Sequence, residues 1–353
     1  MINLLKKYNK QIVILFSCYV LVFFILFMFS YIIYSEKLID SYESGNVVND
    51  YSGSISLKYN DGSIPFEKSN TNSDLDEFNS CYVSKINKDD FSEELRNKYN
   101  DIENYFKASD VSVSFSYEDL YTGLNISYNE NQNYFSASAI KSPVITYIYM
   151  LYLDGKIGFD EVLTYTSSYY VEGSGSIQYD EFGTQYKISE LIRKTVVDSD
   201  NVAYQMLASR VYNTGIMDYW RNLGATTFWT NGSVWGQINS HDGVIYMKQL
   251  YKLINDNPSI RDELLGYYYN SVARLIQLDD DSIKIAHKSG WNSASIHDLA
   301  VIYDKHPYVL AITSLKGYSG YEEFFKEASN LIYDFHKSYW EQKASYCYQK
   351  SFK

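Results

Sequence analysis

A serine and a lysine stand one helical turn apart at the start of a long apolar stretch. Residues 136–141 read SASAIK, and SPVITYIYMLYL follows them. Positions i and i+3 of a helix share a face, so Ser138 and Lys141 can lie side by side. A neutral lysine beside a serine hydroxyl can accept its proton and activate it as a nucleophile. The pair alone is not diagnostic, because an N-cap serine followed by a solvated lysine has the same spacing.

Two further motifs along the chain could complete such a site. A Ser-Asp-Asn triplet at residues 199–201 lies between two helical patterns in VVDSDNVAYQML, and a Lys-Ser-Gly triplet at residues 288–290 lies in the alternating stretch AHKSGW. Each triplet alone has an ordinary explanation, because Ser-Asp-Asn caps helices and Lys-Ser-Gly is typical of a turn at a strand end. All three motifs in this order, each in the expected type of element, are improbable by chance.

The three motifs together resemble those of the penicillin-recognising serine hydrolases, and among these the class A β-lactamase-like branch. The resemblance covers roughly residues 95–340 and includes EGSGSIQYDEFGTQYKISELIRKTVVDSDNVAYQML, NSHDGVIYMKQLYKLI and HKSGW with SIHDLAVIY. It implies an α+β fold of the β-lactamase/transpeptidase-like type. The motifs are specific to the superfamily and less specific to the reaction performed.

The resemblance and the chemistry of the side chains assign three catalytic roles. Ser138 would be the nucleophile at the start of a buried helix, where the helix dipole favours developing negative charge. Lys141 would be its base, with a pKa lowered by burial and by the cation of Lys288. Ser199 would pass a proton to the leaving nitrogen.

Further residues would bind the substrate. Asn201 offers a side-chain amide for the substrate's own amide, and Lys288 and Ser289 offer a cation and a hydroxyl for a carboxylate. The backbone N–H groups of Ser138 and of Trp291, in the substrate-binding segment Gly290–Trp291, would form an oxyanion hole. The resemblance implies no metal and no organic cofactor.

One departure from the family pattern concerns release of the product. Class A β-lactamases carry a glutamate on the omega loop that activates the water freeing the acyl-enzyme, but residues 201–261 contain no glutamate. In the corresponding loop, GATTFWTNGSVWGQINSHDG, we expect Asp242 in the first turn of a helix, and upstream we expect Asp200 to hold a turn. Gln237 or Asn231 could position a water without acting as a base. We therefore expect acylation to outpace deacylation.

The composition and the N-terminal segment bear on localisation. The chain has 353 residues and a net charge of −12, without a long basic block, which argues against nucleic acid as a partner. Residues 12–34 carry no charge and follow three lysines. We expect a single transmembrane helix at residues 11–34, a cytoplasmic tail at residues 1–10 and an extracytoplasmic remainder, with the lipid bilayer as a partner. A cleaved signal peptide is the alternative.

The rest of the chain divides into a tether, a folded domain and a tail. The polar residues 35–90 are predicted to form an extracytoplasmic tether, residues 91–342 the serine hydrolase domain and residues 343–353 a C-terminal tail. Strand patterns lie near both ends of the domain, and helical patterns lie between them. They favour one antiparallel sheet formed by both chain ends, flanked by helices, with an inserted all-helical lobe.

Two cysteines would lie outside the membrane. Terminal helices pack side by side in the resembling fold, so Cys81 and Cys347 can meet and form a disulfide within the chain; two free thiols are the alternative. No cysteine or histidine spacing typical of a zinc site occurs in the sequence.

Three functions are consistent with these motifs. The first is a membrane-anchored serine hydrolase that forms an acyl-enzyme with β-lactams and releases it slowly. The second is a D-Ala-D-Ala peptidase or esterase acting on cell-wall peptides. The third is a module that binds β-lactams or peptidoglycan peptides without turnover. The complete set of Ser, Lys, Ser, Asn and Lys argues against the third function, because a binding module needs no proton relay.

Overall fold

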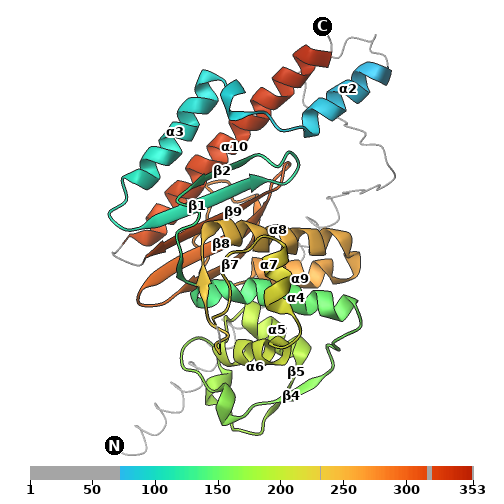
Figure 1. Cartoon of the computed structure of the whole chain (residues 1–353), viewed down its shortest axis with the longest axis vertical. Helices are drawn as coiled ribbons and strands as arrows, with labels where there is room; N and C mark the ends of the chain where they lie inside the picture. The colour runs from blue at the N-terminus through green and yellow to red at the C-terminus, as the bar shows by residue number, and fades with distance from the viewer. Residues whose placement is uncertain (1–71, 231, 316–319, 352–353) are drawn as a thin grey trace, which may run out of the picture. The chain divides into compact units, whose positions relative to one another are not determined.

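The computed structural model describes residues 72–230, 232–315 and 320–351 (Figure 1). The predicted cytoplasmic tail, the predicted transmembrane helix and the first part of the predicted tether lie outside these ranges. Within the described residues, no helix combines the length and the apolar character that crossing a bilayer requires.

Five antiparallel strands from both ends of the domain form the central sheet, in the order β2-β1-β9-β8-β7. The register pairs Phe115 with Ile312 and Ala286 with Val301. Strand β1 therefore pairs directly with β9. The predicted α+β class, with a sheet built from both chain ends, is confirmed. The strands are β1 (Val113–Asp119), β2 (Asn125–Tyr128), β7 (Lys284–Trp291), β8 (Ser295–Tyr303) and β9 (Tyr308–Leu315).

The sheet is buried on both faces, and its side chains alternate between two hydrophobic cores. Leu310 and Ile312 of β9 belong to one core, whereas Val309 and Ala311 belong to the other. Successive side chains of a strand point to opposite faces, so a strand covered on both faces reads as an almost continuous apolar run. This arrangement accounts for the sequence YVLAITSL of β9.

Helices cover each face of the sheet (Figure 1). On one side α3 (Glu93–Lys107) and α10 (Tyr321–Ser351) pack against each other and share a core with β1. On the other side α8 (Ser240–Asp256) packs on β1, β8 and β9, and α9 (Pro258–Tyr269) packs beside β7. The sheet is therefore covered by helices on both faces, and the face with α8 and α9 is the one that carries the residues of the site.

The segment between β2 and β7 supplies the inserted lobe, which is mainly helical. Its helix α4 (Lys141–Leu153) is buried on nearly all sides among α5, α6 and α8, which explains why its sequence is apolar all round. Two short strand pairs, β3 with β6 and β4 with β5, accompany the helices. The other elements, in which η denotes a 3₁₀ helix, are η1 (Lys88–Asp90), β3 (Tyr134–Phe135), η2 (Ala137–Ile140), β4 (Val162–Thr164), η3 (Ser167–Tyr169), η4 (Ile177–Tyr179), β5 (Gln185–Lys187), α5 (Ile188–Val196), α6 (Asn201–Val211), α7 (Ile216–Asn222) and β6 (Gln237–Ile238).

The predicted boundaries between the domain and its tether and tail were wrong, because both segments next to the domain are helical. Helix α2 (Asn72–Val83) lies within the predicted tether, and α10 continues through the predicted tail to Ser351. A disulfide joins Cys81 of α2 to Cys347 of α10, with their Cα atoms 5.6 Å apart. The polar composition predicted solvated chain here, but the covalent link and the few buried side chains beside it hold both segments on the domain.

Candidate active site

Ser138 lies in η2, the short 3₁₀ helix that leads directly into α4. The preceding residue, Ala137, has a φ of 44°, in the left-handed region that residues with a side chain rarely adopt. Such strain persists only where the surrounding contacts impose it, and it is common beside reactive groups. Ser138 is half-buried, and its hydroxyl has no hydrogen-bond partner among the residues that the structure describes.

The predicted substrate-binding strand runs directly beside the backbone of Ser138. A Cβ atom on Gly290 would lie 2.6 Å from the Ser138 amide nitrogen and would also collide with that of Ala139. Only glycine allows so close an approach of two backbones. Gly290 thereby places the end of β7, including Trp291, next to Ser138, as the predicted oxyanion hole requires.

Lys141 is fully buried, and its ammonium group connects two of the sequence motifs. Its Nζ donates to the Ser199 carbonyl at 2.6 Å, to the Ser199 hydroxyl at 3.2 Å and to the Asn201 side-chain oxygen at 2.7 Å. The third motif reaches the same point, because Lys288 Nζ donates to the Ser199 hydroxyl at 3.1 Å. The Ser199 hydroxyl therefore lies between two amines. Among the contacts of described residues, Lys141 makes no hydrogen bond to Ser138.

The environment lowers the pKa of both lysines. Burial holds the pKa of Lys141 well below its usual value, the charge of Lys288 lowers it further, and the charge of Asp200 opposes the shift. Burial lowers the pKa of Lys288 to about 8. Removing two amines from water and placing them around one hydroxyl disfavours two simultaneous positive charges. The three donations described above are those of the protonated amine, so Lys141 gives up one of them when it serves as a neutral base while Lys288 carries the charge.

The turn that carries Ser199 and Asn201 is fixed by Asp200. Ser199 has a φ of 53°, and Asp200 caps α6 by accepting from the Ala203 amide at 2.9 Å. The other carboxylate oxygen accepts from the amides of Ser176 and Ile177 at 2.8 and 3.0 Å. Asp200 is thus occupied in holding the turn, as the sequence predicted.

The glycine-rich loop before η4 borders the site. A Cβ atom on Gly175 would collide with the side chain of Asp200, and one on Gly173 would lie 2.6 Å from the Asn201 amide nitrogen. The Asn201 backbone amide donates to the Ser174 carbonyl, and its side chain donates to the Glu172 carbonyl at 3.1 Å. A substrate amide would compete with Glu172 for the Asn201 donor.

Ser289 and Trp291 differ in how far they are available to a ligand. The Ser289 side chain is buried, and its hydroxyl donates to the Val272 carbonyl at 3.1 Å, so it must rotate to donate to a carboxylate. The Trp291 side chain is 41% exposed. Lys288 also donates to the Ser289 carbonyl, which holds the ammonium along β7.

The loop that replaces the omega loop brings aromatic and neutral side chains to the site. Asp242 is buried in the first turn of α8, where it accepts from the Thr226 and Thr227 amides at 3.0 and 2.6 Å. It anchors the loop, as expected. Gln237 is exposed in β6, and Asn231 lies outside the described residues. Within the described chain, Asp200 is the only carboxylate that acts on the pKa of Lys141.

Two aromatic residues beside Lys141 were not predicted as part of the site. The Lys141 ammonium lies 5.7 Å from the ring centre of Tyr204 and 5.6 Å from that of Trp235. Tyr204 follows Asn201 by three positions on α6, a spacing that predicts a shared face. The sequence carries no comparable signal for Trp235, because the loop conformation brings it there. Trp229 packs inside the loop, where it is buried and donates to the Tyr204 hydroxyl at 2.9 Å.

The fold and the convergence of the three motifs define a protein with the fold of the β-lactamase-like serine hydrolases. The chain belongs to the Beta-lactamase2 family, described as a beta-lactamase enzyme family, whose sequence model matches residues 96–336. No curated protein matches the chain in sequence.

Solved structures of similar fold include enzymes of this type. PBP-A is 20% identical, with a TM-score of 0.62 over 69% of this chain and 96% of its own. A beta-lactamase from Sphaerobacter thermophilus is 15% identical, with a TM-score of 0.60 over 69% of this chain and 97% of its own. TLA-1 extended spectrum beta-lactamase is 19% identical, with a TM-score of 0.60 over 69% and 99%. At these identities the likeness establishes the fold.

Proposed function

We propose that this chain is a membrane-anchored, extracytoplasmic serine hydrolase that forms an acyl-enzyme with β-lactams and releases it slowly. The observation that supports the chemistry is the buried cluster in which the Ser199 hydroxyl accepts from Lys141 and Lys288, beside the half-buried Ser138. A base, a proton relay and a cation are the groups that acyl transfer from an amide requires.

In the proposed reaction, the Ser138 oxygen attacks the β-lactam carbonyl. Neutral Lys141 accepts the hydroxyl proton, and the negative charge on the carbonyl oxygen is held by the backbone N–H groups of Ser138 and Trp291. The C–N bond then breaks, and Ser199 passes a proton to the leaving nitrogen as it receives from Lys141 the proton that Lys141 took from Ser138. Lys288 binds the substrate carboxylate. The product is an ester on Ser138.

Hydrolysis of that ester needs a base next to the incoming water. Asp200 makes three backbone hydrogen bonds and Asp242 anchors the loop, so neither is available for that step. General base catalysis contributes about a hundredfold to ten-thousandfold, or roughly 3–5 kcal/mol of barrier. Lys141 would have to replace part of that contribution, so the acyl-enzyme should persist.

Among the residues that the structure describes, no carboxylate near Lys141 is available, and this also favours a second candidate, a D-Ala-D-Ala peptidase or esterase acting on cell-wall peptides. Of the structures with similar fold, a point mutant of PBP-A is solved as an acyl-enzyme complex with penicillin G. A site that acylates readily and hydrolyses slowly suits a transfer reaction on peptides as well as a slow reaction with penicillin.

The proposed anchor rests on the uncharged residues 12–34 and the lysines before them. N-terminal sequencing of protein from the membrane fraction should find residues upstream of Ile12. A mature protein that begins after Tyr34 would contradict the anchor and leave the chemistry unaffected.

Labelling with a fluorescent penicillin tests the proposed chemistry directly. The full chain in detergent should gain one label per molecule, detected by gel fluorescence and intact mass, and the Ser138→Ala variant should gain none. Ser136→Ala is the matched control, because its hydroxyl is buried with no partner among the described residues. Label retained in Ser138→Ala would contradict the nucleophile. Absence of label together with cleavage of a D-Ala-D-Ala ester would favour the second candidate.

A further inference from the structure

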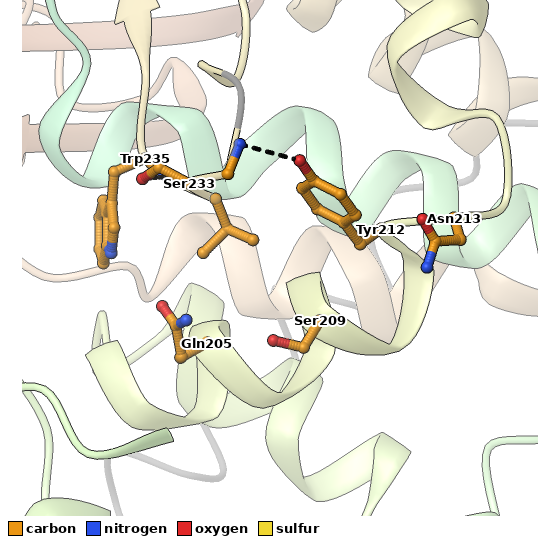
Figure 2. Close-up of a pocket in the computed structure, with 8 residues that line it drawn as sticks. Gln205, Ser209, Tyr212, Asn213, Ser233 and Trp235 are labelled. Carbon is orange, nitrogen blue, oxygen red and sulfur yellow. Dashed lines mark hydrogen bonds between the residues drawn. The ribbon is translucent and has the colours of Figure 1, made fainter. Parts of the chain in front are cut away.

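A hollow of about 440 Å³ lies between α6 and the 232–235 loop, next to the proposed catalytic site (Figure 2). We call it the α6 pocket. Its volume is within the range of small-molecule sites. It is lined by Gln205, Ser209, Tyr212, Asn213, Gly232, Ser233, Val234 and Trp235.

The lining of the α6 pocket is polar but carries no carboxylate, ammonium or guanidinium group. Gln205 and Ser209 are four residues apart on α6 and face the loop from the same side, as Figure 2 shows. Neither their side chains nor that of Asn213 make a hydrogen bond to another residue that the structure describes. Two carboxamides and a hydroxyl can each both donate and accept, so they can pair with a ligand rich in hydroxyl groups.

Aromatic and apolar groups complete the wall. The Trp235 side chain lies at one edge of the pocket and that of Tyr212 toward the other (Figure 2), and Val234 also lines it. The Tyr212 hydroxyl accepts from the Gly232 amide at 3.2 Å. Tyr212 is itself fixed by stacking on Trp229, with ring centres 5.6 Å apart. A rigid aromatic surface next to neutral hydrogen-bonding groups suits the flat apolar face and the hydroxyl rim of a sugar ring.

We propose that the α6 pocket is a binding site for a neutral saccharide. The absence of charged groups in the lining argues against anionic or cationic ligands, whose desolvation would be uncompensated. The site is adjacent to the catalytic cluster, because Trp235 also lies 5.6 Å from the Lys141 ammonium and 4.8 Å from the Tyr204 ring. A ligand bound there would hold Trp235 in its place beside Lys141.

Titration of the full chain with N,N′-diacetylchitobiose, followed by tryptophan fluorescence, tests this site. We expect saturable binding to the parent chain and about tenfold weaker binding to Gln205→Leu and to Ser209→Leu, since each loses a hydrogen-bonding group. Gln249→Leu is the matched control, because Gln249 is half-buried on α8 and outside the pocket. It should bind as the parent does, and circular dichroism should show that all three variants are folded.

The Ser138→Ala variant separates this site from the catalytic one. It should bind the disaccharide as tightly as the parent chain, whether or not a β-lactam acylates Ser138. The proposal is overturned if the disaccharide shows no saturable binding, or if binding is unchanged in both pocket variants. It is also overturned if N-acetyl-alanine amide binds in the pocket and the disaccharide does not, because the ligand would then be a peptide.

Discussion

The two sides of Ser138 are built from different kinds of residue. On one side lie Lys141, Ser199 and Lys288, all buried and joined by hydrogen bonds of 3.1 and 3.2 Å through the Ser199 hydroxyl. On the other side the loop from residue 225 to residue 239 brings Trp235 and neutral polar groups. The first side can move protons, whereas the second has no available base. The groups needed to form an acyl-enzyme are therefore concentrated on one side of Ser138, and the other side adds no base to hydrolyse it.

The first side also has an energetic cost that the second does not. A buried amine is unfavourable unless it is neutral or well paired, and the structure buries two of them around one hydroxyl. Asn201 and the Ser199 carbonyl offset part of this cost by accepting from Lys141. Hydrophobic residues would fill the same space at lower cost, so this arrangement supports a chemical role.

Replacing Lys141 by methionine should give the largest loss. The base is removed while the volume of the side chain is kept, so the rate of acylation of Ser138 by a fluorescent penicillin should fall by about a hundredfold to ten-thousandfold. Lys156→Met is the control, because Lys156 is exposed and pairs with Asp154 at the surface. Thermal unfolding should show that both variants remain folded. An acylation rate within twofold of the parent in Lys141→Met would refute the assignment of the base.

Placing a carboxylate on the second side should convert slow release into faster turnover. Trp235 is the position to change, since its ring lies 5.6 Å from the Lys141 ammonium. In Trp235→Glu we expect the acyl-enzyme to decay about tenfold to a hundredfold faster than in Trp235→Gln, which has the same shape without the base. The decay is measured by intact mass after excess penicillin is removed.

The same change has a second consequence for acylation. A carboxylate near Lys141 favours its protonated form, so the acylation rate of Trp235→Glu at neutral pH should fall below that of Trp235→Gln. Equal decay rates in the Glu and Gln variants would show that the missing base is not what limits release.

The sequence was sufficient to predict the parts of the site that depend on short motifs. Ser138, Lys141 and the triplets at residues 199–201 and 288–290 were identified from spacing, and the structure brings them together. The sheet built from both chain ends was also predictable, because the strands at each end carry apolar alternation. Local patterns of this kind survive in a single sequence.

Features that depend on tertiary packing were not predictable. Trp235 reaches Lys141 only because the loop turns back, with Trp229 bridged to Gly236. The predicted boundaries of the domain were wrong because α2 packs on α10 and is joined to it by a disulfide between residues 266 positions apart. The helical signal of residues 72–83 is weak by itself, and its partner lies at the other end of the chain.

The pH dependence of acylation should separate the two lysines. Lys141 must be neutral to accept a proton, and its pKa is held well below the usual value, so acylation should decline only as the pH falls through that lowered pKa. Lys288 must be charged to bind a carboxylate, and its pKa is about 8. The second-order labelling rate should therefore fall above pH 8, approaching about tenfold per pH unit.

Between about pH 8 and 10.5, the contribution of Lys288 to the free energy of unfolding should rise while the labelling rate falls. The two effects can therefore be told apart. The pKa of Lys288 is lower in the folded than in the unfolded chain, so between about pH 8 and its usual value of 10.5 the unfolded chain binds more protons. The contribution of Lys288 to the free energy of unfolding therefore rises with pH in that range, and loss of labelling there cannot come from this group unfolding the protein. Lys288→Arg, which keeps its charge, should extend labelling to higher pH. An alkaline decline at the same pH in the parent and in Lys288→Arg would assign that decline to another group.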